Sequence, residues 1–369
     1  MRIGIPRETK PGECRVAVTP SGVRALRASG AGIVLETGAG TASGFGDREY
    51  RDAGGTIVPT ASEAWSADLV VKVKEPLSAE FRFLSKSSTL FTFLHLAAFP
   101  QLTEELLTRR VTAIAYETVA SGGALPILRP MSEVAGILSI QVGARGLERG
   151  CGGRGVLLSA TADSPPGDVA VLGAGVAGRN AARTAVGIGA NVTILDVNPD
   201  KLASASRECG GKARTIPSSP EAIEGVLKET DLLVSTVLVA GERAPRLVTR
   251  EMVRSMRHGS AAVDIAIDQG GSIDTSRPTT HAEPFFIEEG VVHYCVTNMP
   301  AAVPRTSTLG LAAAVLPYLL AFAGQGVVGA LRSDDGLLSG LNTCDGHVIC
   351  AGVAKAFGKP FLPPREAIR

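Results

Sequence analysis

The stretch Val169-Ala170-Val171-Leu172-Gly173-Ala174-Gly175-Val176-Ala177-Gly178 decides the fold of the region around it. A short apolar strand runs directly into three glycines with G-x-G-x-x-G spacing, a helix-compatible segment covers 179–187, and a second strand begins at 192. Gly173 allows a tight turn, Gly175 lets the backbone approach a pyrophosphate, and Gly178 lets the helix pack closely on the strand. The helix N-terminus then faces the phosphate charge. The sequence therefore predicts a β-α-β unit that binds a dinucleotide.

Asp196 ends the second strand of this unit, where a carboxylate accepts hydrogen bonds from the adenosine ribose. An anionic side chain at this position repels a 2′-phosphate, which favours NAD over NADP, although Lys201 lies near enough to weaken that preference. Asp196 also has a second interpretation as a turn residue before Asn198-Pro199-Asp200, and a strand end fits both. Val176 and Ala177, between the glycines, complete the predicted cofactor loop.

Strand-like and helix-like segments alternate along the chain on both sides of this unit. The strand candidates are 2–5, 32–35, 69–73, 89–94 and 112–116 in a first set, and 168–172, 191–195, 232–235, 261–265 and 291–296 in a second. Such alternation is typical of parallel sheets with helices on their faces. We therefore predict an α/β protein with two Rossmann-like domains and parallel sheets, separated by an active-site cleft. A helix that opens after Pro130 is a candidate hinge.

Composition narrows the class of protein. The length of 369 residues suits two domains at about 150 residues each. The 37 Lys and Arg residues against 36 Asp and Glu give a net charge of +1, without the basic face that nucleic acids require. Six cysteines form no C-x-x-C pair, so neither a metal site nor a disulfide framework is predicted. Charged residues follow Met1 too soon for a signal peptide, and we expect a cytoplasmic protein.

Residues 309–331 carry no charge and are long enough to cross a bilayer, which takes about 20 residues. Proline and glycines interrupt this stretch, and paired aromatic anchors are missing from its ends. A buried helix from Ser307 to about Ala323, followed by a glycine-rich turn, is favoured over a membrane span. We expect no membrane partner.

Four polar residues stand at or near predicted strand ends, where ligands of open α/β sheets collect. Lys74, His95 and Asp268 follow the strands at 69–73, 89–94 and 261–267, and Arg15 lies after the first strand. Each has a structural alternative: a surface cation, a solvated strand end, a core histidine and a turn carboxylate, respectively. Their shared location favours a catalytic site.

The chain resembles the alanine dehydrogenase and transhydrogenase alpha-subunit family in seven segments that run in the same order. These are Gly4-Ile5-Pro6-Arg7-Glu8-Thr9-Lys10, Arg15-Val16-Ala17-Val18-Thr19-Pro20, Lys72-Val73-Lys74-Glu75-Pro76, Phe93-Leu94-His95-Leu96-Ala97, Met131-Ser132-Glu133-Val134-Ala135-Gly136, Asp264-Ile265-Ala266-Ile267-Asp268-Gln269-Gly270-Gly271 and Asn298-Met299-Pro300. The resemblance implies reversible NAD-dependent oxidative deamination of L-alanine, or a related small amino acid, to a 2-oxo acid and ammonia.

The resemblance also implies roles for residues. Arg15 and Lys74 hold the 2-oxo acid, His95 shuttles protons and Asp268 completes the site, in keeping with a guanidinium that binds carboxylates and an imidazole that titrates near neutrality. The nicotinamide would be lined by Ser132, Val237, Leu238, Ile265, Asp268, Asn298 and Met299. Val237 and Ile265 are equally well explained by sheet packing, and Ser132 by a helix cap. Domains at 1–128 with 305–369 and at 129–304, and a homo-hexamer, are further implications.

Three departures from the family pattern keep other functions open. Cys14 replaces an aromatic residue beside Arg15, Arg129 brings a cation before Met131-Ser132, and residues 159–167 lack the usual glycine-rich loop. A dehydrogenase for a modified or anionic amino acid therefore remains an alternative. So do the nucleotide-binding part of a transhydrogenase and a non-catalytic NAD sensor, although a sensor has no need for Lys74, His95 and Asp268.

Overall fold

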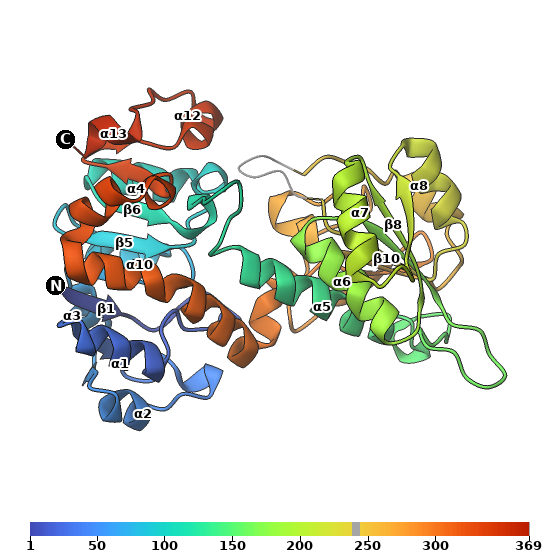
Figure 1. Cartoon of the computed structure of the whole chain (residues 1–369), viewed down its shortest axis with the longest axis horizontal. Coiled ribbons are helices and arrows are strands. Elements are labelled where there is room, and N and C mark those ends of the chain that lie inside the picture. The colour runs from blue at the N-terminus through green and yellow to red at the C-terminus, as the bar shows by residue number, and fades with distance from the viewer. Residues whose placement is uncertain (238–243, 369) are drawn as a thin grey trace. The chain divides into compact units, whose positions relative to one another are not determined.

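The computed structural model describes residues 1–237 and 244–368, which divide into two compact units (Figure 1). The first unit comprises Met1–Met131 and Ala301–Arg369, and the second comprises Ser132–Pro300. The expected boundaries, 1–128 with 305–369 and 129–304, lie a few residues from these. The junction at Met131 falls inside helix α5 (Arg129–Gly146), so this helix begins in one unit and continues in the other.

The first unit is built on an eight-stranded sheet in the order β3-β2-β1-β4-β5-β6-β14-β15. Its strands are β1 (Arg2–Ile5), β2 (Gly32–Glu36), β3 (Thr56–Val58), β4 (Leu69–Val71), β5 (Thr89–Thr92), β6 (Thr112–Ala115), β14 (Leu341–Cys344) and β15 (His347–Val348). The first six are parallel, as predicted, and β14 and β15 join antiparallel at one edge. The sequence patterns missed β3, β14 and β15, which lie at or next to the edges of the sheet.

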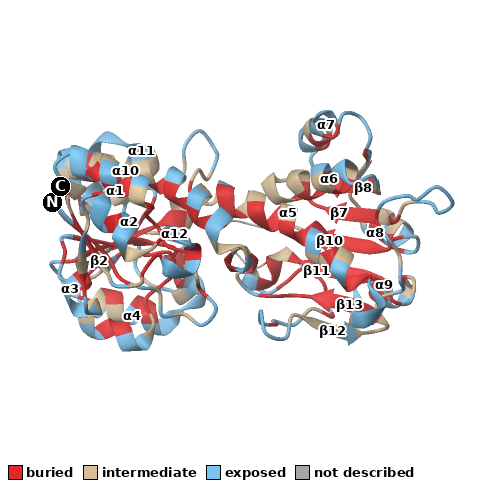
Figure 2. Ribbon diagram, turned by 90° about the horizontal axis from the view of Figure 1, so that it is seen from below, coloured by how far each residue is buried: buried red, intermediate tan, exposed pale blue. Residues whose placement is uncertain are grey.

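Helices cover both faces of this sheet. Leu69 and Val71 of β4 pack with α1 (Pro20–Ala28) and α10 (Pro304–Ser333), whereas Val70, pointing the other way, packs with α4 (Pro100–Thr108). Burial on both faces explains why these strands are continuously apolar, and Figure 2 shows the strands buried beneath helices whose outer sides are exposed. The remaining helices of the unit are α2 (Asp47–Asp52), α3 (Ala61–Trp65), α11 (Asp335–Leu338), α12 (Ala351–Phe357) and α13 (Pro364–Ala367), with short 3₁₀ turns η1 (Thr41–Ser43), η2 (Ser78–Phe83), η3 (Leu96–Ala98) and η4 (Tyr116–Thr118).

The apolar segment 309–331 lies within α10, which is the one helix in the described part of the chain long and apolar enough to span a membrane. A stripe of buried residues, Leu311, Val315, Leu319 and Phe322, packs into the core of the first unit. The predicted end near Ala323 is wrong: the backbone leaves helical geometry only at Gly326 (φ 71°) and then resumes to Ser333. Burial is confined to one stripe, with Leu309 and Val328 about half exposed, so the helix is only partly buried.

The second unit contains a seven-stranded sheet in the order β12-β13-β11-β10-β7-β8-β9. Its strands are β7 (Asp168–Leu172), β8 (Asn191–Asp196), β9 (Arg214–Pro217), β10 (Leu232–Ser235), β11 (Ala261–Asp264), β12 (Phe285–Glu288) and β13 (Val291–Tyr294). All pairings are parallel except β12 with β13. Leu232 contacts α5, whereas Leu233 packs with α8 (Pro220–Leu227) and α9 (Arg250–Ser255), so helices lie on both faces. The other elements are α6 (Val176–Gly187), α7 (Pro199–Glu208), η5 (Arg149–Cys151), η6 (Ile265–Gln269) and η7 (Met299–Ala302).

Both sheets contain the same arrangement of six parallel strands. In the first sheet β1 lies between β2 and β4, and in the second β7 lies between β8 and β10. The chain therefore adds two strands on one side of the first strand and three on the other, which is the 3-2-1-4-5-6 order of the Rossmann fold. Loops that leave the two central strands diverge at their carboxyl ends, and this point is where such folds bind ligands.

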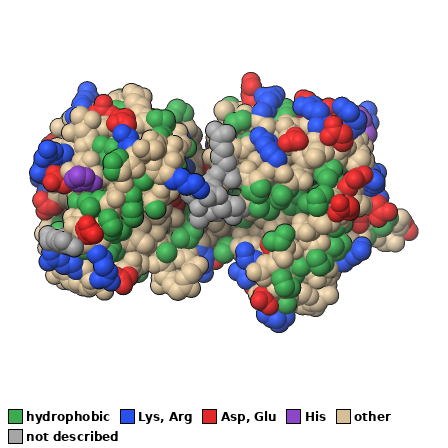
Figure 3. Space-filling model, turned by 90° about the horizontal axis from the view of Figure 1, so that it is seen from above, with side chains coloured by type: hydrophobic (Ala, Val, Ile, Leu, Met, Phe, Trp, Pro, Cys, Tyr) green, Lys and Arg blue, Asp and Glu red, His purple; other side chains and the backbone are tan. Residues whose placement is uncertain are grey.

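The surface of the described chain does not concentrate one sign of charge on the face shown in Figure 3, where acidic and basic side chains are interspersed among apolar ones. This distribution agrees with the near balance of 37 basic and 36 acidic residues.

Close packing of α5 on α6 makes Gly136 a critical residue of the second unit. A β-carbon at Gly136 would lie 2.1 Å from the carbonyl oxygen of Ala177, a backbone atom that cannot move alone. We expect Gly136→Ala to lower the free energy of unfolding by about 1–3 kcal/mol through overpacking, measured by thermal or urea unfolding. Gly187→Ala at the end of α6 is the matched control, since a β-carbon there meets no atom within 4 Å, and it should be neutral or stabilising by up to about 1 kcal/mol. Equal stability of the two variants would contradict this account.

Candidate active site

Arg15 and Lys74 both come from loops at the switch point of the first sheet. Arg15 lies in the loop that follows β1, and Lys74 lies three residues beyond the end of β4 at Val71, the strand that pairs with β1. The predicted strand 69–73 is thus shorter than expected, although Lys72 and Val73 still exchange backbone hydrogen bonds with β5 and the residue after it. Both cations are buried, with exposures of 2% for Arg15 and 6% for Lys74.

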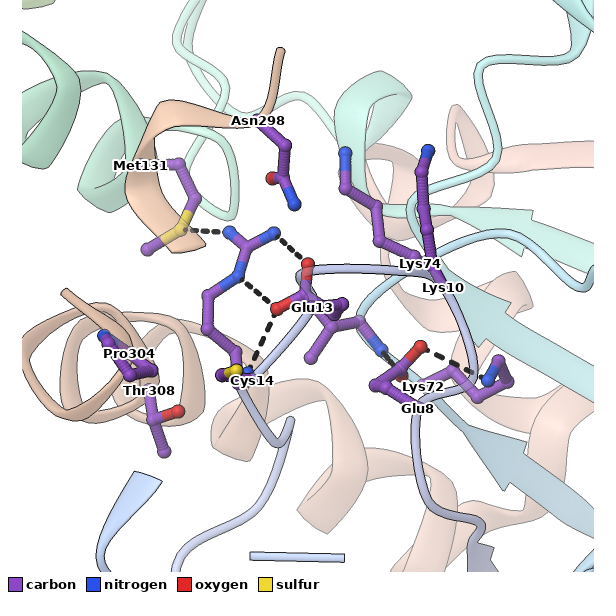
Figure 4. A network of polar contacts seen from close by, with 12 residues as sticks. Glu8, Lys10, Glu13, Cys14, Lys72, Lys74, Met131, Asn298, Pro304 and Thr308 are labelled. Carbon is purple, nitrogen blue, oxygen red and sulfur yellow. Dashed lines mark hydrogen bonds and ion pairs between the residues drawn. The ribbon is translucent and has the colours of Figure 1, made fainter. Parts of the chain in front are cut away.

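The guanidinium of Arg15 is held by Glu13 and Met131 (Figure 4). Its Nε and Nη2 donate to the two carboxylate oxygens of Glu13 at 2.8 and 2.6 Å, and Nη1 lies 3.0 Å from the Met131 sulfur. A side-on pair of this kind fixes both the position and the plane of the guanidinium. Arg15 is therefore oriented before any ligand binds.

A second group of buried charges lies beside Lys74. Lys72 is fully buried between the carboxylates of Glu8 at 3.1 Å and Glu80 at 3.0 Å. Burial alone would lower the pKa of the Lys72 ammonium, but these two carboxylates outweigh it and raise the pKa. Burial raises the pKa of the Glu8 carboxyl, against the opposing effect of Lys72. Glu75 in turn pairs with Lys10 at 2.5 Å.

His95 lies three residues beyond β5 rather than directly at its end. Its backbone is in the left-handed region (φ 48°), and its N–H donates to Glu117 Oε1 at 2.6 Å. The same carboxylate accepts from the Leu94 N–H and lies 3.9 Å from His95 Nδ1, while the imidazole stacks on Phe93. A non-glycine residue with positive φ is strained and persists where surrounding contacts hold it. His95 is thus a partly exposed imidazole, 34% accessible, on a backbone held by Glu117, and not a core histidine.

The glycine loop of the second unit has the predicted geometry. Gly173 has φ 97°, and a β-carbon at Gly178 would lie 1.8 Å from the Gly173 carbonyl oxygen, so both positions require glycine for folding. Gly175 differs, because it is extended (φ −70°, ψ −169°) and a β-carbon there meets no atom within 4 Å. Nothing in the polypeptide requires glycine at 175, whereas a pyrophosphate that approaches the N-terminus of α6 does. The residues present therefore fit a dinucleotide.

Asp196 ends β8 as predicted, and its carboxylate has the structural role of a turn residue. One oxygen accepts from the Ala174 N–H at 2.6 Å and the other from the Asn198 N–H at 2.8 Å. Asp196 therefore ties the glycine loop to the turn before α7, and each oxygen keeps a second lone pair for a ribose hydroxyl. Lys201 lies exposed in the first turn of α7, where its N–H donates to the capping Asn198 side chain.

Asp268 was expected at the end of a strand over 261–267, but that strand, β11, stops at Asp264. Asp268 lies exposed in the 3₁₀ turn η6, and both of its carboxylate oxygens accept from the Asn298 N–H at 3.2 Å. The buried Asp264 carboxylate ends the strand instead, because it accepts backbone N–H groups of Ala266 and Ser272.

The other residues expected around the nicotinamide follow the carboxyl ends of strands in the second unit, with one exception. Val237 follows β10, Ile265 follows β11, and Asn298 and Met299 follow β13. Ser132 is the exception, since it lies inside α5, and its interpretation as the helix cap is wrong because α5 begins at Arg129. Leu238 lies outside the described residues.

Two carboxylates of this site were not identified from sequence. Glu13 accepts from the Arg15 guanidinium, and Glu117 accepts from the His95 N–H. Neither residue lies in a segment with the hydrophobic periodicity of a helix or strand. A buried cation needs a counter-ion, so an acidic residue close to Arg15 in the sequence is a candidate for its partner.

Comparison with known proteins places these features in a family. Residues 4–135 match the alanine dehydrogenase/PNT N-terminal domain, and residues 139–351 match the alanine dehydrogenase/PNT C-terminal domain. Alanine dehydrogenase 2 of Staphylococcus aureus (strain USA300) is 49% identical over 371 residues and is covered completely, as is this chain. A solved L-alanine dehydrogenase superposes with a TM-score of 0.93 at 48% identity, covering 97% of this chain and 99% of the other. A transhydrogenase from Sinorhizobium meliloti superposes with a TM-score of 0.81 at 26% identity, covering 95% and 99%. The switch-point cations, the glycine loop and these full-length similarities together show that the chain belongs to the alanine dehydrogenase/PNT family.

Proposed function

We propose that this protein catalyses the reversible NAD-dependent oxidative deamination of L-alanine to pyruvate and ammonia. The observation that carries the proposal is the buried pair of cations, Arg15 and Lys74, at the switch point of a sheet whose chain also holds a complete dinucleotide loop. Relatives named alanine dehydrogenase at 49% identity over the full length favour alanine as the amino acid. They also favour this reaction over a transhydrogenase role, for which the structural relative is 26% identical.

The two cations divide the recognition of the 2-oxo acid between them. The guanidinium of Arg15 presents several N–H donors in a fixed plane and is suited to the carboxylate. The Lys74 ammonium is a compact charge suited to the carbonyl oxygen, whose polarisation assists attack by ammonia. Binding of the substrate carboxylate would require little reorganisation of Arg15, because Glu13 already fixes the guanidinium.

His95 is the proposed proton carrier. Ammonia addition to the carbonyl gives a carbinolamine, and loss of water to form the imine requires a proton on the departing oxygen. An imidazole titrates near neutral pH and can donate this proton, then accept one in the reverse direction. Glu117 and Phe93 hold the ring, which limits the entropy lost when it meets the substrate.

Asp268 is proposed to assist beside the reacting nitrogen, where a carboxylate stabilises an ammonium or orients water. Its exposure leaves the carboxylate accessible, and its two hydrogen bonds to the Asn298 N–H fix its position.

NAD is the proposed cofactor and supplies the hydride acceptor for the α-carbon of the amino acid. Gly173, Gly175, Val176, Ala177 and Gly178 would hold its pyrophosphate, Asp196 its adenosine ribose with Lys201 nearby, and Ser132, Val237, Leu238, Ile265, Asn298 and Met299 its nicotinamide side. The negative charge of Asp196 supports NAD over NADP. A cytoplasmic homo-hexamer is the proposed state of the protein, on family resemblance alone.

The proposed reaction is tested by a steady-state screen of 2-oxo acids with ammonia and NADH. We expect pyruvate to be the best substrate and NADH oxidation to depend on ammonia. A dehydrogenase for an anionic amino acid would instead favour a dicarboxylic 2-oxo acid. Absence of turnover across the panel, with NADH still bound, would support a non-catalytic sensor and contradict the proposal.

The role of His95 is tested with His95→Asn, because asparagine tolerates the left-handed backbone that this position requires. We expect kcat to fall by about 10²–10⁴-fold, the usual contribution of a general acid or base. Binding of NADH, followed by fluorescence, should stay unchanged. Wild-type kcat in a folded variant would remove His95 from the mechanism.

Selectivity for NAD is tested with Asp196→Asn, which keeps an oxygen able to accept the Ala174 N–H but removes the charge. We expect kcat/KM with NADPH, relative to NADH, to rise by roughly tenfold or more as repulsion of the 2′-phosphate is lost. Asp200→Asn, an exposed position in the first turn of α7, is the control with the same change of charge. An unchanged ratio in Asp196→Asn would show that selectivity resides elsewhere.

A further inference from the structure

Glu13, the buried counter-ion of Arg15, takes no part in the proposed reaction beyond holding that guanidinium. We infer that Glu13 is a positioning and specificity-determining residue, which holds Arg15 for one substrate carboxylate and whose charge disfavours substrates with a second. The inference rests on the proposed function, since it takes Arg15 as the residue that binds the substrate carboxylate.

The geometry of the Glu13 side chain supports the positioning role. The side chain has no exposed surface, and its Oε1 accepts from both the backbone N–H and the Nε of Arg15, at 2.9 and 2.8 Å. Its Oε2 accepts from Nη2 at 2.6 Å. Glu13 thus engages the side-on edge of the guanidinium and Met131 lies against Nη1, so the protein itself sets the position and plane of Arg15.

The balance of charge around Arg15 supports the specificity role. The buried charges of the loops after β1 and β4, with the neighbouring η2, are three cations and four carboxylates: Arg15, Lys72 and Lys74 against Glu8, Glu13, Glu75 and Glu80. Six of these seven residues are buried and the Glu8 side chain is 6% exposed, so water screens their charges poorly. Glu8, Glu13 and Glu80 pair with these cations, and Glu75 pairs with the partly exposed Lys10. The group therefore offers no surplus positive charge for a substrate that carries two carboxylates.

Glu13 is the carboxylate of this group that touches Arg15 directly. A second carboxylate on the substrate would lie near it in a medium of low dielectric constant, where like charges repel strongly. A purely structural counter-ion would affect folding and overall activity, but it would not change the preference between two substrates of equal length. That preference is therefore the diagnostic measurement.

The test compares 2-oxobutanoate with oxaloacetate, which have the same number of carbons but end in a methyl group and a carboxylate, respectively. The ratio of their kcat/KM values is measured with ammonia and NADH for the full-length protein, Glu13→Gln and Glu13→Asp. In Glu13→Gln we expect the ratio to shift toward oxaloacetate by about tenfold or more. In Glu13→Asp, which keeps the charge but shortens the reach to Arg15, both kcat/KM values should fall while the ratio stays close to that of the wild type.

Glu105→Gln is the control with the same change of charge, because Glu105 also pairs with an arginine, Arg109 Nε at 2.6 Å, but on the partly exposed surface of α4. Both kcat/KM values should be unchanged there. If Glu13→Gln does not fold, Glu13→Asn against Glu13→Asp gives the same comparison at shorter length. An unchanged ratio in the neutral variant, or an equal change in Glu13→Asp, would overturn the inference. Absence of any 2-oxo acid turnover by the wild type would overturn the proposed function and this inference together, whereas turnover with an unchanged ratio would overturn this inference alone.

Discussion

The reversal of strand order beside the central strand of each sheet is the constraint on which the rest of the structure depends. Because β2 and β4 lie on opposite sides of β1, and β8 and β10 on opposite sides of β7, the loops that leave these strands cannot continue side by side. Open α/β sheets bind their ligands at this point. In the first sheet the loops at this point carry buried cations, and in the second they carry glycines. The same strand order therefore supports two different kinds of loop.

Local sequence patterns predicted those parts of the fold that local interactions determine. The bounds of β7 and β10 follow from apolar runs alone, and glycine spacing predicted a helix over 179–187 that ends as expected but begins three residues earlier, at Val176. The strands β3, β9, β12, β14 and β15 could not be found in this way, since they lie at or near sheet edges and form by pairing with distant segments. Leu341 of β14, for example, pairs with Ile114 of β6 across the chain. The break in α10 lies at Gly326 rather than near Ala323 because Gly326 is the residue that takes a positive φ, which glycine adopts readily.

The candidate site was predictable in its cations and less so in its carboxylates. Arg15, Lys74 and His95 stand out because few residue types bind carboxylates or titrate near pH 7. Glu13 and Glu117 are ordinary acidic residues in the sequence, and only the folded chain shows which cation or backbone group each one reaches. Asp268 does not end a strand as predicted; the strand end belongs to Asp264, whose side chain caps the turn.

Features that folding does not require are the strongest guide to what this chain binds. Glycine at 175 has an unrestricted backbone and open space around it, and an alanine there would cost the empty protein nothing through contacts. The buried Arg15–Glu13 pair is the converse case, since desolvating two charges is often no more favourable than packing apolar residues in their place. Position 175 would accept residues other than glycine. Positions 13 and 15 hold charges where an apolar pair would suffice for folding. Both agree with the proposed ligands, which carry negative charge: a pyrophosphate at Gly175 and a carboxylate at Arg15.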